Sequence, residues 1–77
     1  MTRVGILGGT FDPIHYGHLV IAEDARVYLR LEKVLFVPAY LPPHKTHRVY
    51  SAFDHRVRMI ELGIEGNLHF SLSLIEA

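Results

Sequence analysis

The chain has 77 residues, which is enough for one small domain and no more. Eight lysines and arginines balance eight aspartates and glutamates, and this zero net charge argues against a nucleic-acid-binding protein that neutralises many phosphates. The sequence has no cysteine for a disulfide or a thiolate zinc site, and no apolar run with the length of a membrane span or the form of a signal peptide. We therefore expect a cytoplasmic protein without a membrane or nucleic-acid partner.

The first predicted elements are a strand and a helix joined by a glycine turn. Residues 3–7 form an apolar run that is typical of a buried parallel strand, and the glycines at 8–9 close it. Glycine allows positive φ and close approach of a ligand to the main chain. Residues 18–29 repeat apolar side chains at helical spacing, which predicts a helix that begins near residues 16–17. Its free N–H groups and positive dipole end would face the turn and could hold a phosphate.

Two histidines stand at the start of this helix. His15 and His18 are three residues apart, so they project from the same side if the first turn is helical, and Gly17 between them leaves room for a bulky ligand. Taken singly, a surface histidine or a glycine pair is ordinary loop chemistry, but their combination after a strand favours a phosphate site. The alternative is a zinc site of Asp12, His15 and His18, which is weakened because no cysteine and no further carboxylate stands nearby.

The rest of the chain continues the alternation of strands and helices. Residues 33–37 are rich in strand formers, and residues 51–54 have the spacing of a capping box before a helix that ends at 66–67. Residues 68–75 alternate apolar and polar side chains, which predicts a third strand. The order β-α-β-α-β predicts an α/β fold, the Rossmann-like mononucleotide-binding half of a doubly wound sheet, with three parallel strands in one half-domain over 1–77.

A basic, proline-rich segment follows the second strand, at the position where open α/β sheets bind ligands. It contains His44, Lys45, His47 and Arg48. From the residues alone these are solvated charges on an exposed connection, and for the part from 46 to 50 this interpretation is favoured. Arg56, in the helix that follows, is interpreted as a surface residue or a structural ion-pair partner rather than a ligand contact.

Residues 8–19, Gly-Gly-Thr-Phe-Asp-Pro-Ile-His-Tyr-Gly-His-Leu, resemble the signature of the nucleotidyltransferases with a His-x-Gly-His motif. Within these they are most similar to the bacterial nicotinate-nucleotide adenylyltransferases, which make deamido-NAD from ATP and nicotinate mononucleotide. His15 and Thr10 differ from the Thr and Ser that are usual in the relatives that adenylylate phosphopantetheine. The Val-Pro-x-x-x-Pro-Pro-His-Lys stretch at 37–45 is absent from the cytidylyltransferases. The resemblance covers essentially all of the chain but only the first part of the usual family chain, which is more than twice as long.

The resemblance also implies a reaction, in which the acceptor phosphate attacks the α-phosphorus of ATP and expels pyrophosphate. Mg²⁺ would arrive with the nucleotide. The implied catalytic residues are His15, His18 and Lys45, and His44 and Lys45 would bind substrate phosphate. The implied nucleotide-binding residues are Gly8, Gly9, Thr10, Phe11, His15 and His18.

Two other classes of function stay open, because the family's acceptor-base pocket and a later phosphate-binding segment lie outside these residues. One is a nucleotide-binding module, which would bind ATP without releasing pyrophosphate. The other is an inactive fragment, which would show no stabilisation by ATP. In the family's arrangement strand 3–7 is central, so here Val4, Ile6 and Leu7 would lie on an unpaired apolar edge. We therefore expect either a fragment of a longer protein or a homo-oligomer that pairs through this edge.

Overall fold

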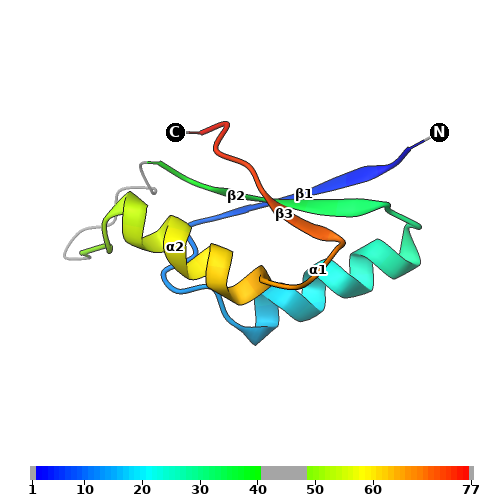
Figure 1. Ribbon diagram of the computed structural model, residues 1–77, viewed down its shortest axis with the longest axis horizontal. Helices are drawn as coiled ribbons and strands as arrows, with labels where there is room; N and C mark the ends of the chain where they lie inside the picture. Colours follow the sequence, from blue (N-terminus) through cyan, green and yellow to red (C-terminus); the bar gives the residue numbers. More distant parts are fainter. Residues whose placement is uncertain (1, 41–48, 77) are drawn as a thin grey trace.

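A computed structural model describes residues 2–40 and 49–76 of the chain. It confirms the predicted α/β fold, with three parallel strands in the order β1-β2-β3 and two helices between them (Figure 1). The elements are β1 (Val4–Gly9), α1 (Tyr16–Tyr28), β2 (Lys33–Pro38), α2 (Phe53–Ile64) and β3 (Phe70–Leu72).

The strand register brings the carboxyl ends of β1 and β2 together. These two strands pair from Val4 opposite Lys33 to Gly9 opposite Pro38, and the pairing continues beyond the strand where the Ala39 N–H donates to the Gly9 carbonyl (2.9 Å). Both crossovers step the same way across the sheet, and with right-handed connections this places both helices on one face, as Figure 1 shows. The loops after β1 and β2 therefore leave the sheet side by side.

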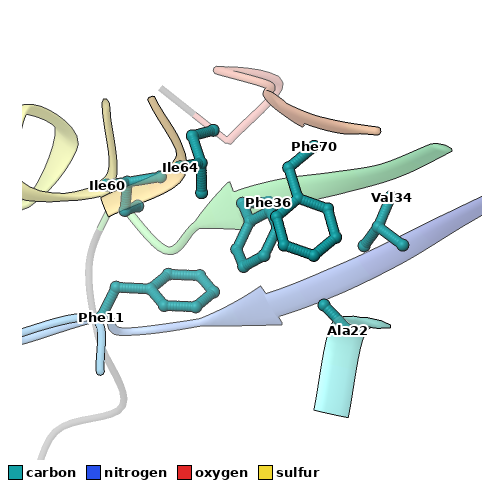
Figure 2. Close-up of a cluster of buried hydrophobic side chains, with 7 residues drawn as sticks. All are labelled: Phe11, Ala22, Val34, Phe36, Ile60, Ile64 and Phe70. Carbon is teal, nitrogen blue, oxygen red and sulfur yellow. The ribbon is translucent and has the colours of Figure 1, made fainter. Parts of the chain in front are cut away.

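The core fills the space between the sheet and the helices, and aromatic rings form its centre. The Phe36 ring of β2 lies 5.8 Å from the Phe11 ring and 5.1 Å from the Phe70 ring, measured between centroids. Figure 2 shows these rings along the sheet, with Ile60 and Ile64 of α2 to one side of them and Ala22 of α1 to the other. The buried cluster consists of Phe11, Ala22, Val34, Phe36, Ile60, Ile64 and Phe70. Because Phe11 belongs to the loop after β1, this loop is anchored in the core.

Three predicted boundaries are wrong. The strand expected over 68–75 covers only Phe70–Leu72, and its pairing with β2 ends where Phe36 lies opposite Leu72. Helix α2 ends at Ile64 rather than at 66–67, and Gly66 has a φ of +82° that is incompatible with a right-handed helix. The first strand continues to Gly9, so both glycines of the expected turn are paired strand residues.

The capping box expected at 51–54 is also wrong. Ala52 occupies the N-cap position of α2 and provides no side-chain hydrogen bond. Ser51 instead donates its backbone N–H to Oδ2 of Asp12 (2.8 Å), which ties the start of α2 to the loop after β1. Asp54 in the first helical turn still complements the helix dipole.

β1 is an edge strand, as predicted. It pairs with β2 on one side, and Ile6 at its centre is 73% exposed. Leu7 points the other way and packs against the core cluster. A groove of about 420 Å³ lies between β1 and α1 and is lined mainly by apolar residues, among them Val4, Ile21 and Leu29. Within the described ranges, no helix combines the length and the apolar character needed to cross a bilayer.

Candidate phosphate-binding site

The loop between β1 and α1 is shaped by Phe11 rather than by its glycines. Phe11 has a φ of +52°, whereas Gly8 and Gly9 have the extended backbone of β1. The Phe11 ring folds back over Gly9, where an added Cβ would lie 3.4 Å from the ring. The ring thus lies at van der Waals distance from position 9, and neither Gly8 nor Gly9 uses the positive φ that glycine allows.

His15 and His18 form reciprocal hydrogen bonds with the backbone at the start of α1. The Gly17 N–H donates to Nδ1 of His15, and the His15 N–H donates to Nδ1 of His18, each at 3.0 Å. The two imidazoles lie with their centroids 4.0 Å apart and their planes 34° apart. The prediction that they project from the same side is confirmed, and they also act as a capping box in which imidazoles replace the usual hydroxyl and carboxylate.

These bonds determine where the imidazole protons are. A ring nitrogen that accepts an N–H carries no proton, so the neutral rings of His15 and His18 both have their hydrogen on Nε2. Each ring therefore keeps one N–H donor that the helix cap does not use. Two such donors on adjacent rings suit an anion with several acceptor oxygens.

The surroundings keep His18 neutral. Its pKa is lowered from the ordinary value, first because the ring is partly buried and second because His15 lies beside it. The Phe11 ring contributes to this burial, with its centroid 4.9 Å from that of His18. His15 is exposed, so the two donors differ in their access to water.

The first turn of α1 has little amide capacity left for a ligand. The Gly17 N–H is taken by the His15 ring, and the N–H groups of His18 and Leu19 both point to the His15 carbonyl (3.0 and 3.3 Å). A Cβ at Gly17 would lie 2.8 Å from Cε1 of His15, so the space above Gly17 holds this imidazole rather than a ligand. The donors that the site offers are mainly the two imidazoles, not the free helix amides that were expected.

The zinc alternative has no support in this geometry. The described ranges contain no group of three histidine, cysteine, aspartate or glutamate side chains that could hold a metal ion. The Asp12 carboxylate accepts the Ser51 N–H, and each of the two histidines uses Nδ1 for the backbone.

The predicted phosphate residues His44 and Lys45, together with His47 and Arg48, lie outside the described residues.

The model of the cytidylyltransferase-like family matches residues 6–76. The chain belongs to this family. It is 50% identical over 76 residues to a probable nicotinate-nucleotide adenylyltransferase of Thermomicrobium roseum, and 49% identical to one of Bacillus pumilus. In each case 99% of the chain is matched, but it spans only 36% and 40% of these relatives' lengths. The fold is similar to a Plasmodium falciparum nicotinic acid mononucleotide adenylyltransferase complexed with NaAD, with a TM-score of 0.78 and 21% identity, covering all of this chain and 38% of that one.

In this member of the cytidylyltransferase-like family, Arg56 has a different place from the one predicted. Its side chain is buried rather than on the surface, and within the described ranges it donates to backbone carbonyls and forms no ion pair. A signal was present in the sequence: Arg56, Ile60 and Ile64 follow at intervals of four, so the arginine lies on the buried stripe of α2.

Proposed function

We propose that the protein carrying this chain transfers the adenylyl group of ATP to nicotinate mononucleotide, giving deamido-NAD and pyrophosphate. The observation that supports this most is the pair of imidazoles at the start of α1, each with an N–H donor to spare. The identity of about one half to relatives named nicotinate-nucleotide adenylyltransferases supports the choice of acceptor. The chain spans about two fifths of those relatives, so the proposal concerns the protein as a whole.

The proposed reaction requires no covalent enzyme intermediate. An oxygen of the acceptor phosphate forms a bond to the α-phosphorus of ATP, and the bond from that phosphorus to the bridging oxygen breaks. The electron pair of the broken bond leaves with pyrophosphate. Because the acceptor phosphate is already an anion, no strong base is needed, and the protein has to position the reactants and neutralise charge on the transferring group.

In this proposal the two imidazoles donate Nε2–H to phosphate oxygens of ATP. His18 is the stronger candidate for the transition state, because a partly buried donor acts in a lower dielectric than an exposed one. The backbone of residues 8–11 is proposed to border the same phosphates. His44 and Lys45 are proposed to bind the acceptor phosphate or the leaving pyrophosphate by charge. Mg²⁺ is proposed to enter as part of the ATP substrate, held by phosphate oxygens and water.

The test is pyrophosphate release by the full chain with ATP, Mg²⁺ and nicotinate mononucleotide, combined with ATP binding by calorimetry. We expect His18→Ala to lower turnover by about a hundredfold while ATP affinity changes little. His55→Ala, which removes an exposed histidine of α2, is the matched control and should leave both quantities unchanged. Equal losses of turnover and affinity in the His18 variant would contradict the transition-state role. ATP binding without pyrophosphate release would indicate a nucleotide-binding module. The absence of both ATP binding and pyrophosphate release would indicate a chain without nucleotide function.

A further inference from the structure

Arg56 joins three segments of the chain through one buried side chain, of which 1% is exposed. Among the described residues its guanidinium donates four hydrogen bonds, and each acceptor is a backbone carbonyl. Nη1 donates to Thr10 (2.9 Å) and Ala39 (2.7 Å), Nη2 to Tyr40 (3.2 Å) and Nε to Ser51 (3.0 Å). These acceptors belong to the loop after β1, the chain after β2 and the approach to α2. The same side chain thus holds the exits of two neighbouring strands.

Burying a guanidinium in the core costs more free energy than burying an apolar side chain of similar size. Removing its positive charge from water is strongly unfavourable unless its N–H groups are satisfied. Here carbonyl dipoles satisfy them, and the Phe53 ring lies 5.4 Å from Cζ and adds a cation–π contact. An apolar side chain would fill this space at a lower cost but could not fix four carbonyls in direction. Lysine would keep the charge but lacks the planar fork that reaches several acceptors at once.

Of the four carbonyls that Arg56 holds, that of Thr10 belongs to the loop that leads to the phosphate site. The next residue, Phe11, has a φ of +52°, a conformation that a bulky side chain adopts only when its surroundings enforce it. The Phe11 ring in turn packs 4.9 Å from the ring of His18, measured between centroids. A continuous set of contacts therefore runs from the guanidinium through the Thr10 carbonyl and the Phe11 ring to the imidazole.

We propose that Arg56 is a positioning residue of the phosphate site, which holds the Thr10 carbonyl and thereby fixes Phe11 and the imidazole of His18. In this proposal Arg56 acts through the loop rather than by contact with the nucleotide, because only 1% of it is exposed and it donates to backbone carbonyls. The ligand part of this inference rests on the proposed function, whereas the link to His18 does not. A side chain that only stabilised the fold would change the amount of folded protein and leave the histidine pair unchanged in the molecules that remain folded.

The test compares Arg56→Lys and Arg56→Met with Arg58→Met in the full chain. Arg58 lies two positions along the same helix, is exposed, and pairs with Glu61 at 3.6 Å, so it controls for the loss of one charge from α2. ¹⁵N NMR of the imidazoles reports which ring nitrogen of His18 carries the proton and at which pH the ring titrates. Calorimetry gives the affinity for MgATP, and urea unfolding gives the folded fraction by which each affinity is corrected.

In the Arg56 variants we expect a second population of His18 with the proton on Nδ1. The pKa of His18 should rise toward the ordinary imidazole range, because the Phe11 ring no longer covers the His18 ring. MgATP affinity per folded molecule should change little, as in His18→Ala, whereas pyrophosphate release per folded molecule should fall by about tenfold, and Arg56→Lys should recover little of it. Arg58→Met should match the unaltered chain in all of these readings. Unchanged His18 tautomer and titration in a folded Arg56 variant would overturn the proposal.

The remaining outcomes are also decisive. Variants that unfold in buffer are measured in trimethylamine N-oxide, which favours the folded state. In the unaltered chain, MgATP should shift the Arg56 Nε–H signal and slow its hydrogen exchange several-fold, since coupling between two sites is reciprocal. An Arg56 signal that MgATP leaves unmoved while the ligand binds would overturn the positioning role. If the unaltered 77-residue chain does not bind MgATP, the ligand part of the inference fails for this chain, and the tautomer of His18 in the variants alone decides the role of Arg56.

Discussion

His15 and His18 each use one ring nitrogen to hold the backbone and keep the other as a donor. Protonation of Nδ1 of His18 would break the bond that it accepts from the His15 N–H, so this part of the helix cap and the neutral state of His18 support each other. The same bonds restrict the rotation of both rings, which lowers the entropy lost when an anion binds. The cap therefore preorganises the donors before any ligand arrives.

Gly17→Ala tests this preorganisation. The new Cβ would lie 2.8 Å from Cε1 and 3.0 Å from Nδ1 of His15, so the imidazole must rotate away and lose its cap bond. We expect turnover to fall by about a hundredfold, as for a catalytic group displaced by about 1 Å. Alanine is the better helix former, so stability should change by less than about 1 kcal/mol. The measurements are pyrophosphate release and urea unfolding, with the exposed Val20→Ala as control, and unaltered turnover in Gly17→Ala would contradict the role of this cap.

The lowered pKa of His18 predicts how stability depends on pH. The unfolded chain binds this proton more tightly than the folded chain, since the ordinary imidazole pKa is about 6.5 and the folded value lies below it. The corresponding part of the stability is fully present above about pH 6.5 and is lost as the pH falls through the folded-state pKa. Urea unfolding between about pH 8 and pH 5 should show this loss, and it should be smaller in His18→Gln. A variant that loses stability as steeply as the unaltered chain would refute the assignment.

Residue spacing alone could predict the histidine pair but not the rest of the site. Positions three apart meet on any helix, so the proximity of His15 and His18 follows from local geometry. The burial of Arg56 depends on acceptors as far away in sequence as Thr10, and the positive φ of Phe11 depends on a core that local sequence does not reveal. The periodicity of α2 gave the only local indication that position 56 faces inward.

At the scale of elements, apolar periodicity located both helices and all three strands, because burial on one face is a local pattern. Apolar periodicity predicted the lengths of these elements less well. Alternation over 68–75 reports which side chains can face a core, whereas strand length depends on pairing, and β3 pairs with β2 only from Phe70 to Leu72. The expected cap at Ser51 failed for a similar reason, because a carboxylate far back in the chain, Asp12, takes the Ser51 N–H.

Helix α2 is held to the sheet by its buried stripe, which Ile60→Val tests. Ile60 is fully buried in the core cluster, so loss of one methylene should lower the free energy of unfolding by about 1 kcal/mol. Ile21→Val in α1 makes the same chemical change at a side chain that is 60% exposed, and it should cost a few tenths of a kcal/mol at most. Urea unfolding measures both. Equal losses in the two variants would mean that α2 does not pack on the sheet as described.

At the scale of the whole molecule, the two crossovers place β1 at one edge of the sheet, with the loop that leads into α1 at its carboxyl end. This follows from the order of elements and the handedness of βαβ connections, and it could be predicted from the sequence. The apolar groove between β1 and α1 could not be predicted from the sequence, because its walls come from both elements and its depth depends on how α1 crosses the sheet. The open edge of β1 and the groove beside it leave backbone hydrogen-bond donors, backbone acceptors and apolar side chains available on the same side of the molecule.

We expect this edge to pair with a second copy of the 77-residue chain, because an exposed apolar strand is a template for another strand. Sedimentation velocity over about a hundredfold range of concentration should show dimers or larger species that dissociate on dilution. Ile6→Lys places a charge at the centre of β1, where Ile6 is 73% exposed, and should shift the chain to monomer with little loss of stability. Leu68→Lys adds the same charge at an exposed leucine away from this edge and should leave association unchanged. A monomer at every concentration, or equal effects of the two lysines, would show that β1 is not the contact surface.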